Sequence, residues 1–158
     1  MKFLTQILIT CLLFGVFSCD SSRVYEENAV LETPYWVKGQ SLEFQFAIDD
    51  KSSNHDLIFN IRNSLSYPFQ NIYIQYILSD SLNQEMMAEM KEFYLFDQKT
   101  GEPLGDGLGD LFDNSFPLYE GYSFKNTGRY SIKLEQFMRI DSLPMILSVG
   151  IRVQKSEQ

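Results

Sequence analysis

The sequence predicts an all-β protein, a single antiparallel β-sandwich of jelly-roll type with about seven or eight strands and at most one short helix. Apolar residues make up 44% and aromatic residues 15% of its 158 residues, which is enough for one hydrophobic core. Several segments alternate apolar and polar residues with the period of two that is typical of half-buried strands. Short turn-forming segments separate them. A closed barrel is less favoured, because no segment repeats at even spacing.

Residues 1–18 have the features of a lipoprotein signal peptide. Lys2 precedes an apolar run that ends near Phe17 and is shorter than the roughly 20 apolar residues of a membrane-spanning helix. Val16-Phe17-Ser18-Cys19 resembles the lipobox of bacterial lipoproteins, where the chain is cut before the cysteine and its thiol is diacylated. Cys19 is therefore the expected lipidation site. The alternative is an ordinary signal peptide with Cys19 at its cleavage point by chance.

The remaining chain is predicted to contain one domain. Residues 19–28 are polar and acidic and are expected to form a lipidated tether, with order starting near Val24. Residues 29–154 are expected to form the β-sandwich and residues 155–158 a tail. Cys11 leaves with the signal peptide and Cys19 is acylated, so the mature chain has no thiol for a disulfide, a metal or a nucleophile. The domain must then be stabilised by its hydrophobic core alone.

The first half of the domain contains the clearest strand patterns. Residues 31–38 hold the only tryptophan, Trp36, and suit an edge strand interrupted by a proline. Residues 41–49 alternate strictly. Residues 56–78 predict two strands joined by a polar loop at 63–71, and the second of these strands is expected to be buried on both faces.

The second half is less regular. Residues 82–92 have apolar side chains at helical spacing and predict a short helix or irregular segment, followed by a strand over 92–97. The competing interpretation is a strand over 87–96 preceded by a loop. Residues 98–110 hold four of the nine glycines and predict a loop in which glycine allows positive φ angles. Residues 111–122 are expected to be irregular, and residues 129–139 and 147–154 to form strands.

No set of residues in the sequence predicts catalysis or metal binding. The formal charge of −8 and the absence of a Lys/Arg cluster argue against a nucleic-acid partner. His55 is the only histidine, is expected in a surface loop, and has no cysteine or serine placed beside it for nucleophilic catalysis. Asp106, Asp110 and Asp113 do not have the spacing of a calcium loop. We therefore expect no enzyme, no cofactor, no metal and no small-molecule substrate.

Polar and aromatic residues around the loop at 63–71 are the candidates for a binding site. Arg62 and Arg139 each end an apolar strand, where either could pair with a loop aspartate. The aromatic residues Tyr67, Phe69 and Tyr73, together with Trp36, are expected to be exposed, as an interaction patch or as the end cap of the sandwich. The candidates for interaction, or for locking the loop, are Arg62, Asn63, Tyr67, Asn71, Trp36 and Arg139.

Several segments, taken in order, resemble the GldH-type gliding motility lipoproteins. They are the lipobox at Cys19, residues 24–25, Trp36, residues 61–63 and 67–71, the glycine-rich residues 104–110, and residues 128–130, 136–139 and 143–153. The chain departs from the family pattern at Pro103, where Trp is more usual, and at Gln136, where His is expected. The resemblance implies a non-enzymatic lipoprotein that supports gliding motility and the associated type IX secretion machinery through contacts with other envelope proteins.

The protein is expected in the cell envelope, anchored in the outer membrane through the acylated Cys19. The sequence does not predict whether the domain faces the periplasm or the cell surface. A lipid-anchored carbohydrate-binding module is the alternative function. In that case exposed Trp36 and Tyr67 would stack on sugar rings.

Overall fold

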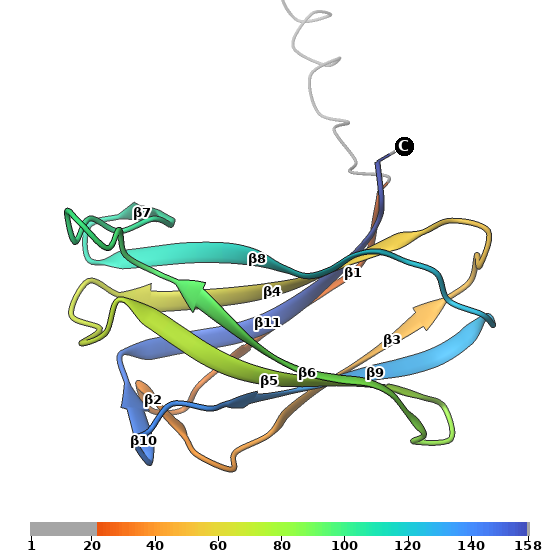
Figure 1. The fold of residues 1–158 in the computed structure, drawn as a ribbon, viewed down its shortest axis with the longest axis horizontal. Coiled ribbons are helices and arrows are strands. Elements are labelled where there is room, and N and C mark those ends of the chain that lie inside the picture. Colours follow the sequence, from red (N-terminus) through yellow and green to blue (C-terminus); the bar gives the residue numbers. More distant parts are fainter. Residues whose placement is uncertain (1–21, 158) are drawn as a thin grey trace, which may run out of the picture.

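The computed structural model describes residues 22–157, which form antiparallel strands and contain no helix (Figure 1). No helix long and apolar enough to cross a membrane is therefore found within this part of the chain. The strands are β1 (Arg23–Val30), β2 (Tyr35–Val37), β3 (Leu42–Ile48), β4 (His55–Ser64), β5 (Asn71–Asp80), β6 (Glu85–Tyr94), β7 (Asp106–Leu108), β8 (Leu111–Tyr122), β9 (Gly128–Gln136), β10 (Ser142–Pro144) and β11 (Ile146–Lys155).

Two sheets lie face to face, in agreement with the predicted β-sandwich (Figure 1). One sheet has the order β1-β11-β4-β8-β7 and the other β3-β9-β5-β6, while β2 and β10 form a short separate ribbon at one corner. Eight strands have seven or more residues, and β2, β7 and β10 have three each. The all-β prediction is confirmed.

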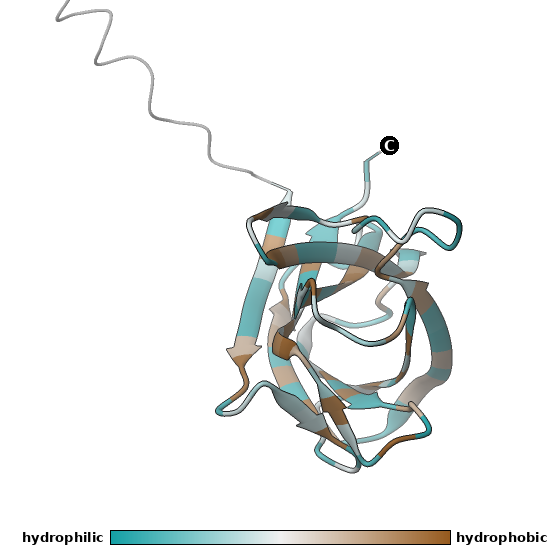
Figure 2. Cartoon of the chain, turned by 90° about the vertical axis from the view of Figure 1, so that its left-hand side faces the viewer, coloured by the Kyte–Doolittle hydropathy of each residue, from teal (hydrophilic) through white to brown (hydrophobic). Residues whose placement is uncertain are grey.

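The core lies between the two sheets and is built from alternate residues of the long strands. Viewed along the long axis of the molecule, hydrophobic and hydrophilic residues alternate along the strands that surround the core (Figure 2). Burying one such apolar side chain contributes about 1.5–3 kcal/mol, so the alternation determines which face of each strand turns inward. The largest fully buried side chains include Trp36, Phe44, Phe59, Tyr76 and Phe124.

The helix expected over residues 82–92 is wrong, because this segment forms most of strand β6. The strand pairs with β5 along its length, with Tyr76 opposite Glu89. The segment contains good intrinsic helix formers, but it gains a hydrogen-bonded ladder with β5 and buries Phe93 in the core. These tertiary interactions outweigh the helix propensity. The competing interpretation of residues 87–96 as a strand is closer to the structure.

The irregular segment expected over residues 111–122 is also wrong. These residues form β8, the longest strand, which pairs with β4 in spite of Pro117. Pro117 lies opposite Ile58, next to a register shift between Leu57 and Ile58. An irregularity in the ladder is where a strand can tolerate a residue without a backbone N–H.

The first strand begins close to Val24, where order is expected to start, but the sandwich begins before residue 29, its expected first residue. β1 starts at Arg23 and pairs with β11, with Glu27 opposite Ile151, so much of the predicted tether is part of the sheet. The Tyr25 ring packs against Phe46 of the other sheet, at a centroid distance of 5.9 Å. β11 likewise continues to Lys155, into the predicted tail. Cys19 and the signal peptide lie outside the described residues.

Candidate functional site

Tyr67 fixes the loop between β4 and β5 from inside. Its backbone N–H donates to Ser64 O at 3.0 Å, and its hydroxyl donates to Asn71 O at 2.9 Å. The side chain is only 5% exposed, and burial raises the pKa of its hydroxyl. Tyr67 is therefore part of the core and not of an exposed aromatic patch, which corrects the sequence expectation.

Asn63 and Asn114 form a buried polar pair between β4 and β8. Asn114 Nδ2 donates to Asn63 Oδ1 at 3.0 Å, and Asn63 Nδ2 donates to Ser64 O at 3.2 Å. Both side chains are buried. The pair satisfies hydrogen-bonding groups that would otherwise destabilise the core, so its role is to fix the end of β4.

The glycine-rich segment packs directly on this asparagine pair. A Cβ atom on Gly105 would lie 2.5 Å from Asp113 O and 2.7 Å from Asn114 Cγ, which is too close for any side chain. Gly109 has the expected positive φ of 69°, whereas Gly105 has no positive φ and is needed for close approach to β8. This segment thus serves packing, and within residues 22–157 no group of three His, Cys, Asp or Glu side chains could hold a metal ion.

Arg62 pairs with Asp113, which lies on β8 and not in a loop. Arg62 Nε and Nη2 lie 2.7 and 2.6 Å from the two carboxylate oxygens, a bidentate arrangement. The hydrogen bonds and the charge of Asp113 raise the pKa of Arg62. The two side chains are 47% and 57% exposed, so water screens the pair.

Trp36 is fully buried, contrary to expectation. It lies on β2 opposite Leu143 of β10, and its Nε1 donates to Gln40 O at 3.0 Å. Trp36 thus anchors the β2–β10 ribbon to the core. The carbohydrate-binding alternative depended on exposed Trp36 and Tyr67, and neither ring is available for stacking on a sugar.

His55 is also buried, although the sequence places it in a polar loop. It is the first residue of β4, and its ring meets Phe124 edge-on at a centroid distance of 5.4 Å. Burial lowers the pKa of His55, as does the charge of Lys155, against the smaller opposing effects of Asp50, the Ser53 backbone and Asp56. Asp56 instead accepts hydrogen bonds from Gly121 N and Ser156 Oγ, so it does not orient the histidine for catalysis.

An open groove of about 700 Å³ lies on the four-stranded sheet. Tyr73 of β5 alternates with the buried Ile72 and Ile74, and Met90 of β6 lies opposite Gln75, which has the same outward position as Tyr73. The groove therefore lies on the outer face of that sheet. It extends towards the corner occupied by β2 and β10, at the lower left of Figure 1. Its lining residues are Lys38, Phe69, Tyr73, Met90, Phe137, Met138, Arg139 and Ile140.

Gln136 holds the segment that forms one wall of this groove. The side chain is buried, its Oε1 accepts a hydrogen bond from Met138 N at 2.8 Å, and its Nε2 donates to Ile140 O at 3.2 Å. Phe137 N donates to Tyr73 O at 2.7 Å and ties the same segment to β5. These bonds leave the Phe137 ring 48% exposed beside the exposed Arg139.

Asn71, the first residue of β5, lies beside the groove and is bonded to β6. Its Nδ2 donates to Glu92 Oε1, and this bond, together with hydrogen bonds from Tyr73 and Tyr94, lowers the pKa of Glu92. Of the candidates predicted from sequence, Arg139, Phe69 and Tyr73 therefore meet at the groove and Asn71 lies beside it. Asn63, Tyr67 and Trp36 are instead buried, and Arg62 pairs with Asp113 at the surface of the other sheet.

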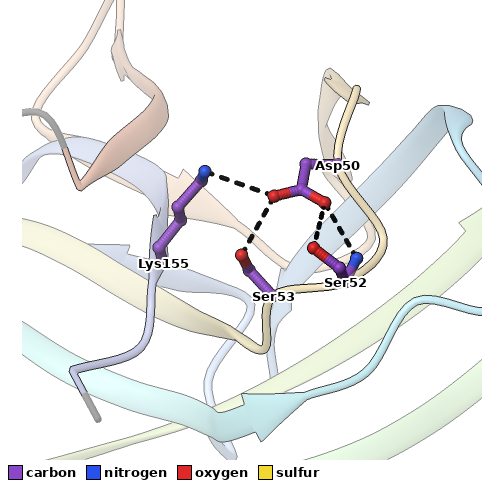
Figure 3. A network of polar contacts seen from close by, with 4 residues as sticks. All are labelled: Asp50, Ser52, Ser53 and Lys155. Carbon is purple, nitrogen blue, oxygen red and sulfur yellow. Dashed lines mark hydrogen bonds and ion pairs between the residues drawn. The ribbon is translucent and has the colours of Figure 1, made fainter.

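The first strand, β1, belongs to the five-stranded sheet, so the chain begins on the sheet that does not carry the groove. Lys155 N donates to Ser22 O at 2.7 Å, and Lys155 Nζ lies 3.4 Å from Asp50 Oδ2. Asp50 also accepts hydrogen bonds from Ser52 and Ser53, which hold its pKa well below the usual range (Figure 3). This network fixes the start of the domain at the top of Figure 1, on the side away from the β2–β10 corner.

Comparisons with known proteins identify the family. Residues 23–153 match the model of the GldH lipoprotein family. The chain is 29% identical to a gliding motility lipoprotein GldH homolog of Christiangramia forsetii, over 95% of this chain and 93% of that protein. It is 24% identical to the gliding motility lipoprotein GldH of Flavobacterium johnsoniae, over 90% of this chain and 91% of that protein.

Among solved structures, the similarities are weak. Latent PorU of Porphyromonas gingivalis aligns with a TM-score of 0.29 and 12% identity, over 90% of this chain but only 14% of that one. The coat protein of Tobacco streak virus aligns with a TM-score of 0.27 and 10% identity, over 84% of this chain and 88% of that one. Neither similarity supports a functional argument. The family model, in contrast, matches nearly the whole described domain, and the chain therefore belongs to the GldH lipoprotein family.

Proposed function

We propose that this protein is a non-enzymatic lipoprotein of the cell envelope, anchored in the outer membrane, which supports gliding motility and the associated type IX secretion machinery through protein–protein contacts. Its relatives are named gliding motility lipoproteins. The observation that carries the proposal of protein contacts is the exposed apolar groove, since such a surface on a monomer is typical of interaction sites.

The anchor is the acylated Cys19. Only Asp20 and Ser21 stand between Cys19 and Ser22, the first residue that the structure describes, so the link from lipid to domain is short. Each buried acyl CH₂ contributes about 0.8 kcal/mol, and two or more chains hold a protein in the membrane far longer than one. Confinement to the membrane raises the effective concentration of the domain, so even a weak contact can hold it in a complex.

The position of the groove suits this arrangement. The chain enters the fold at the start of β1, which belongs to the five-stranded sheet, whereas the groove lies on the outer face of the four-stranded sheet. A domain tethered at the former therefore leaves the latter accessible to other envelope proteins.

Metabolic labelling with an alkyne fatty acid tests the anchor. The wild type and Cys11→Ala should incorporate the label, because Cys11 lies within the signal peptide, whereas Cys19→Ala should not. The same membranes, fractionated into inner and outer membrane, test the location. Label retained by Cys19→Ala, or enrichment of the wild type in the inner membrane, contradicts this part of the proposal.

Crosslinking and pull-down from native membranes test the contacts. Gliding and secretion envelope proteins should be recovered with the wild type and with Tyr119→Ser, and lost with Phe137→Ser. Tyr119 is a matched control because it is an exposed aromatic residue, at 38%, on β8 of the other sheet. Recovery of no envelope protein above background, or the same recovery with both variants, argues against the groove as the contact surface.

A further inference from the structure

We infer that the groove binds an apolar polypeptide segment that carries an acidic side chain, and that Lys38 and Arg139 contact its carboxylate. The inference builds on the proposed function, since it specifies the chemistry of the partner at the same surface. It depends on three properties of the groove: its apolar lining, its unpaired cations and its position in the fold.

The lining offers adaptable apolar contact area. Phe137 is 48% and Met90 56% exposed, and the half-buried Phe69 and Tyr73, which also line the groove, pack against the core. Aromatic and methionine side chains are enriched in protein interfaces, and the flexible thioether of methionine fits differently shaped partners. The segment that carries Phe137 is held by the Gln136 side chain, which bonds to the backbone of Met138 and Ile140, so this wall of the groove is present before a partner arrives.

Lys38 and Arg139 are the charged residues of this lining. Among the described residues, neither has a carboxylate within 4.0 Å, whereas Arg62 and Lys155 are both paired. Glu92 of β6 instead accepts a hydrogen bond from Asn71. Two unpaired cations beside an apolar surface, in a chain of formal charge −8, favour a ligand that brings its own negative charge.

A polypeptide fits this groove better than a lipid. The exposed fractions of Phe137 and Met90 show that the groove is open along the surface, whereas pockets for small apolar ligands enclose most of the ligand. The groove also lies on the opposite sheet from the strand that leads to the lipidated cysteine. The chain itself has an exposed apolar residue between acidic ones, Leu108 at 95% exposure between Asp106 and Asp110. This segment does not line the groove of the same molecule.

Site-specific photo-crosslinking tests the inference in the full-length, acylated protein in native membranes. The photo-crosslinking residue p-benzoylphenylalanine replaces Phe137, and in a control it replaces Tyr119. The crosslinked peptides are sequenced by mass spectrometry. We expect position 137 to yield a segment of another protein with apolar residues around an Asp or Glu, and position 119 not to yield that segment.

Charge reversal then tests the role of the cations. Lys38→Glu or Arg139→Glu, in the p-benzoylphenylalanine background, should reduce the crosslink at least tenfold, whereas Arg139→Lys should retain most of it. Replacing the mapped partner carboxylate with Arg should restore the crosslink to Arg139→Glu. Circular dichroism of each variant confirms that the strands persist, which is expected because both cations lie at the surface.

Four results overturn the inference: a crosslinked segment without an acidic residue, a crosslink to lipid or to a second copy of this chain, a crosslink insensitive to charge reversal, or no crosslink at position 137. The first and third leave protein contact at the groove intact, so they refute the carboxylate and not the proposed function. If position 137 gives no protein crosslink and the pull-down also fails, both proposals are refuted.

Discussion

Asn114 donates a hydrogen bond from its Nδ2 to Oδ1 of Asn63 at 3.0 Å, between β4 and β8, where both side chains are shielded from water. The glycine-rich segment covers the pair at Gly105, which has no room for a Cβ atom. Two strands whose contacting residues are 51 positions apart in the sequence are thereby joined, together with the glycine-rich segment, at one buried polar contact. This contact explains why an amide at residue 63 and a glycine at residue 105 are both required by the fold.

Asn114→Leu should destabilise the domain by about 1–3 kcal/mol, because it leaves the Asn63 Oδ1 buried without a donor. Urea unfolding followed by circular dichroism measures the change. Ser115→Ala is the control, because Ser115 is exposed on the same strand as Asn114 and its hydroxyl donates to Asn60 of β4 at the surface. Its loss of stability should be about 0.5 kcal/mol or less. Equal unfolding midpoints for the two variants would contradict the structural role of the asparagine pair.

Arg62→Ala should change stability by only about 0–1 kcal/mol, in spite of its bidentate geometry, because the Arg62–Asp113 pair is about half exposed. A double-mutant cycle with Asp113→Ala isolates the interaction energy of the two side chains. A coupling above about 2 kcal/mol would show that the pair behaves like a buried one.

The sequence predicts the all-β class and several of the strands because the core requires strict alternation, as in the segment with Phe44, Phe46 and Ile48. It gives most of β6 only as the competing interpretation, because Leu82, just before this strand, and Met86 and Met90 within it recur at helical spacing. Met86 and Met90 turn outward in a strand whose ladder with β5 is a long-range property. β8 is missed for the same reason, since its pairing with β4 depends on residues far away in the chain.

Parts of the groove are visible in the sequence and parts are not. Arg139 and the aromatic residues near Pro68 stand out by residue type, although residue type does not separate the buried Tyr67 from the partly exposed Tyr73. Lys38 and Met90 come to the groove only through the pairing of strands. The outward position of Met90 opposite Gln75 on β5 follows once β6 is recognised as a strand.

Tyr67→Phe should destabilise the domain by about 1–2 kcal/mol, because the Asn71 carbonyl loses its donor while the ring stays in place. Chemical denaturation measures this, with Tyr35→Phe as the control, since Tyr35 is 44% exposed. If Tyr67→Phe is as stable as the wild type, the hydroxyl does not lock the loop.

Trp36→Ala should cost about 3–5 kcal/mol, as expected for removal of a large side chain from a packed core. Trp36→Phe should recover much of the loss without restoring the hydrogen bond to Gln40. Thermal unfolding distinguishes the two variants. A stable Trp36→Ala domain that fails only in binding would instead show that the residue faces a partner.

His55 should make the domain less stable as the pH falls below 6.5, its ordinary pKa. Because burial lowers its pKa in the folded state, the unfolded chain binds a proton more readily in this range, and stability decreases as the pH falls towards the folded-state pKa. The carboxyl groups of Asp56 and Glu92 have pKa values lowered from 3.8 and 4.5, so their losses begin at more acidic pH. Unfolding free energies measured between pH 7 and about pH 5 therefore report on the histidine. In His55→Phe, which keeps a ring against Phe124, the unfolding free energy should be nearly constant over this window; the same slope as in the wild type would assign the effect to another group.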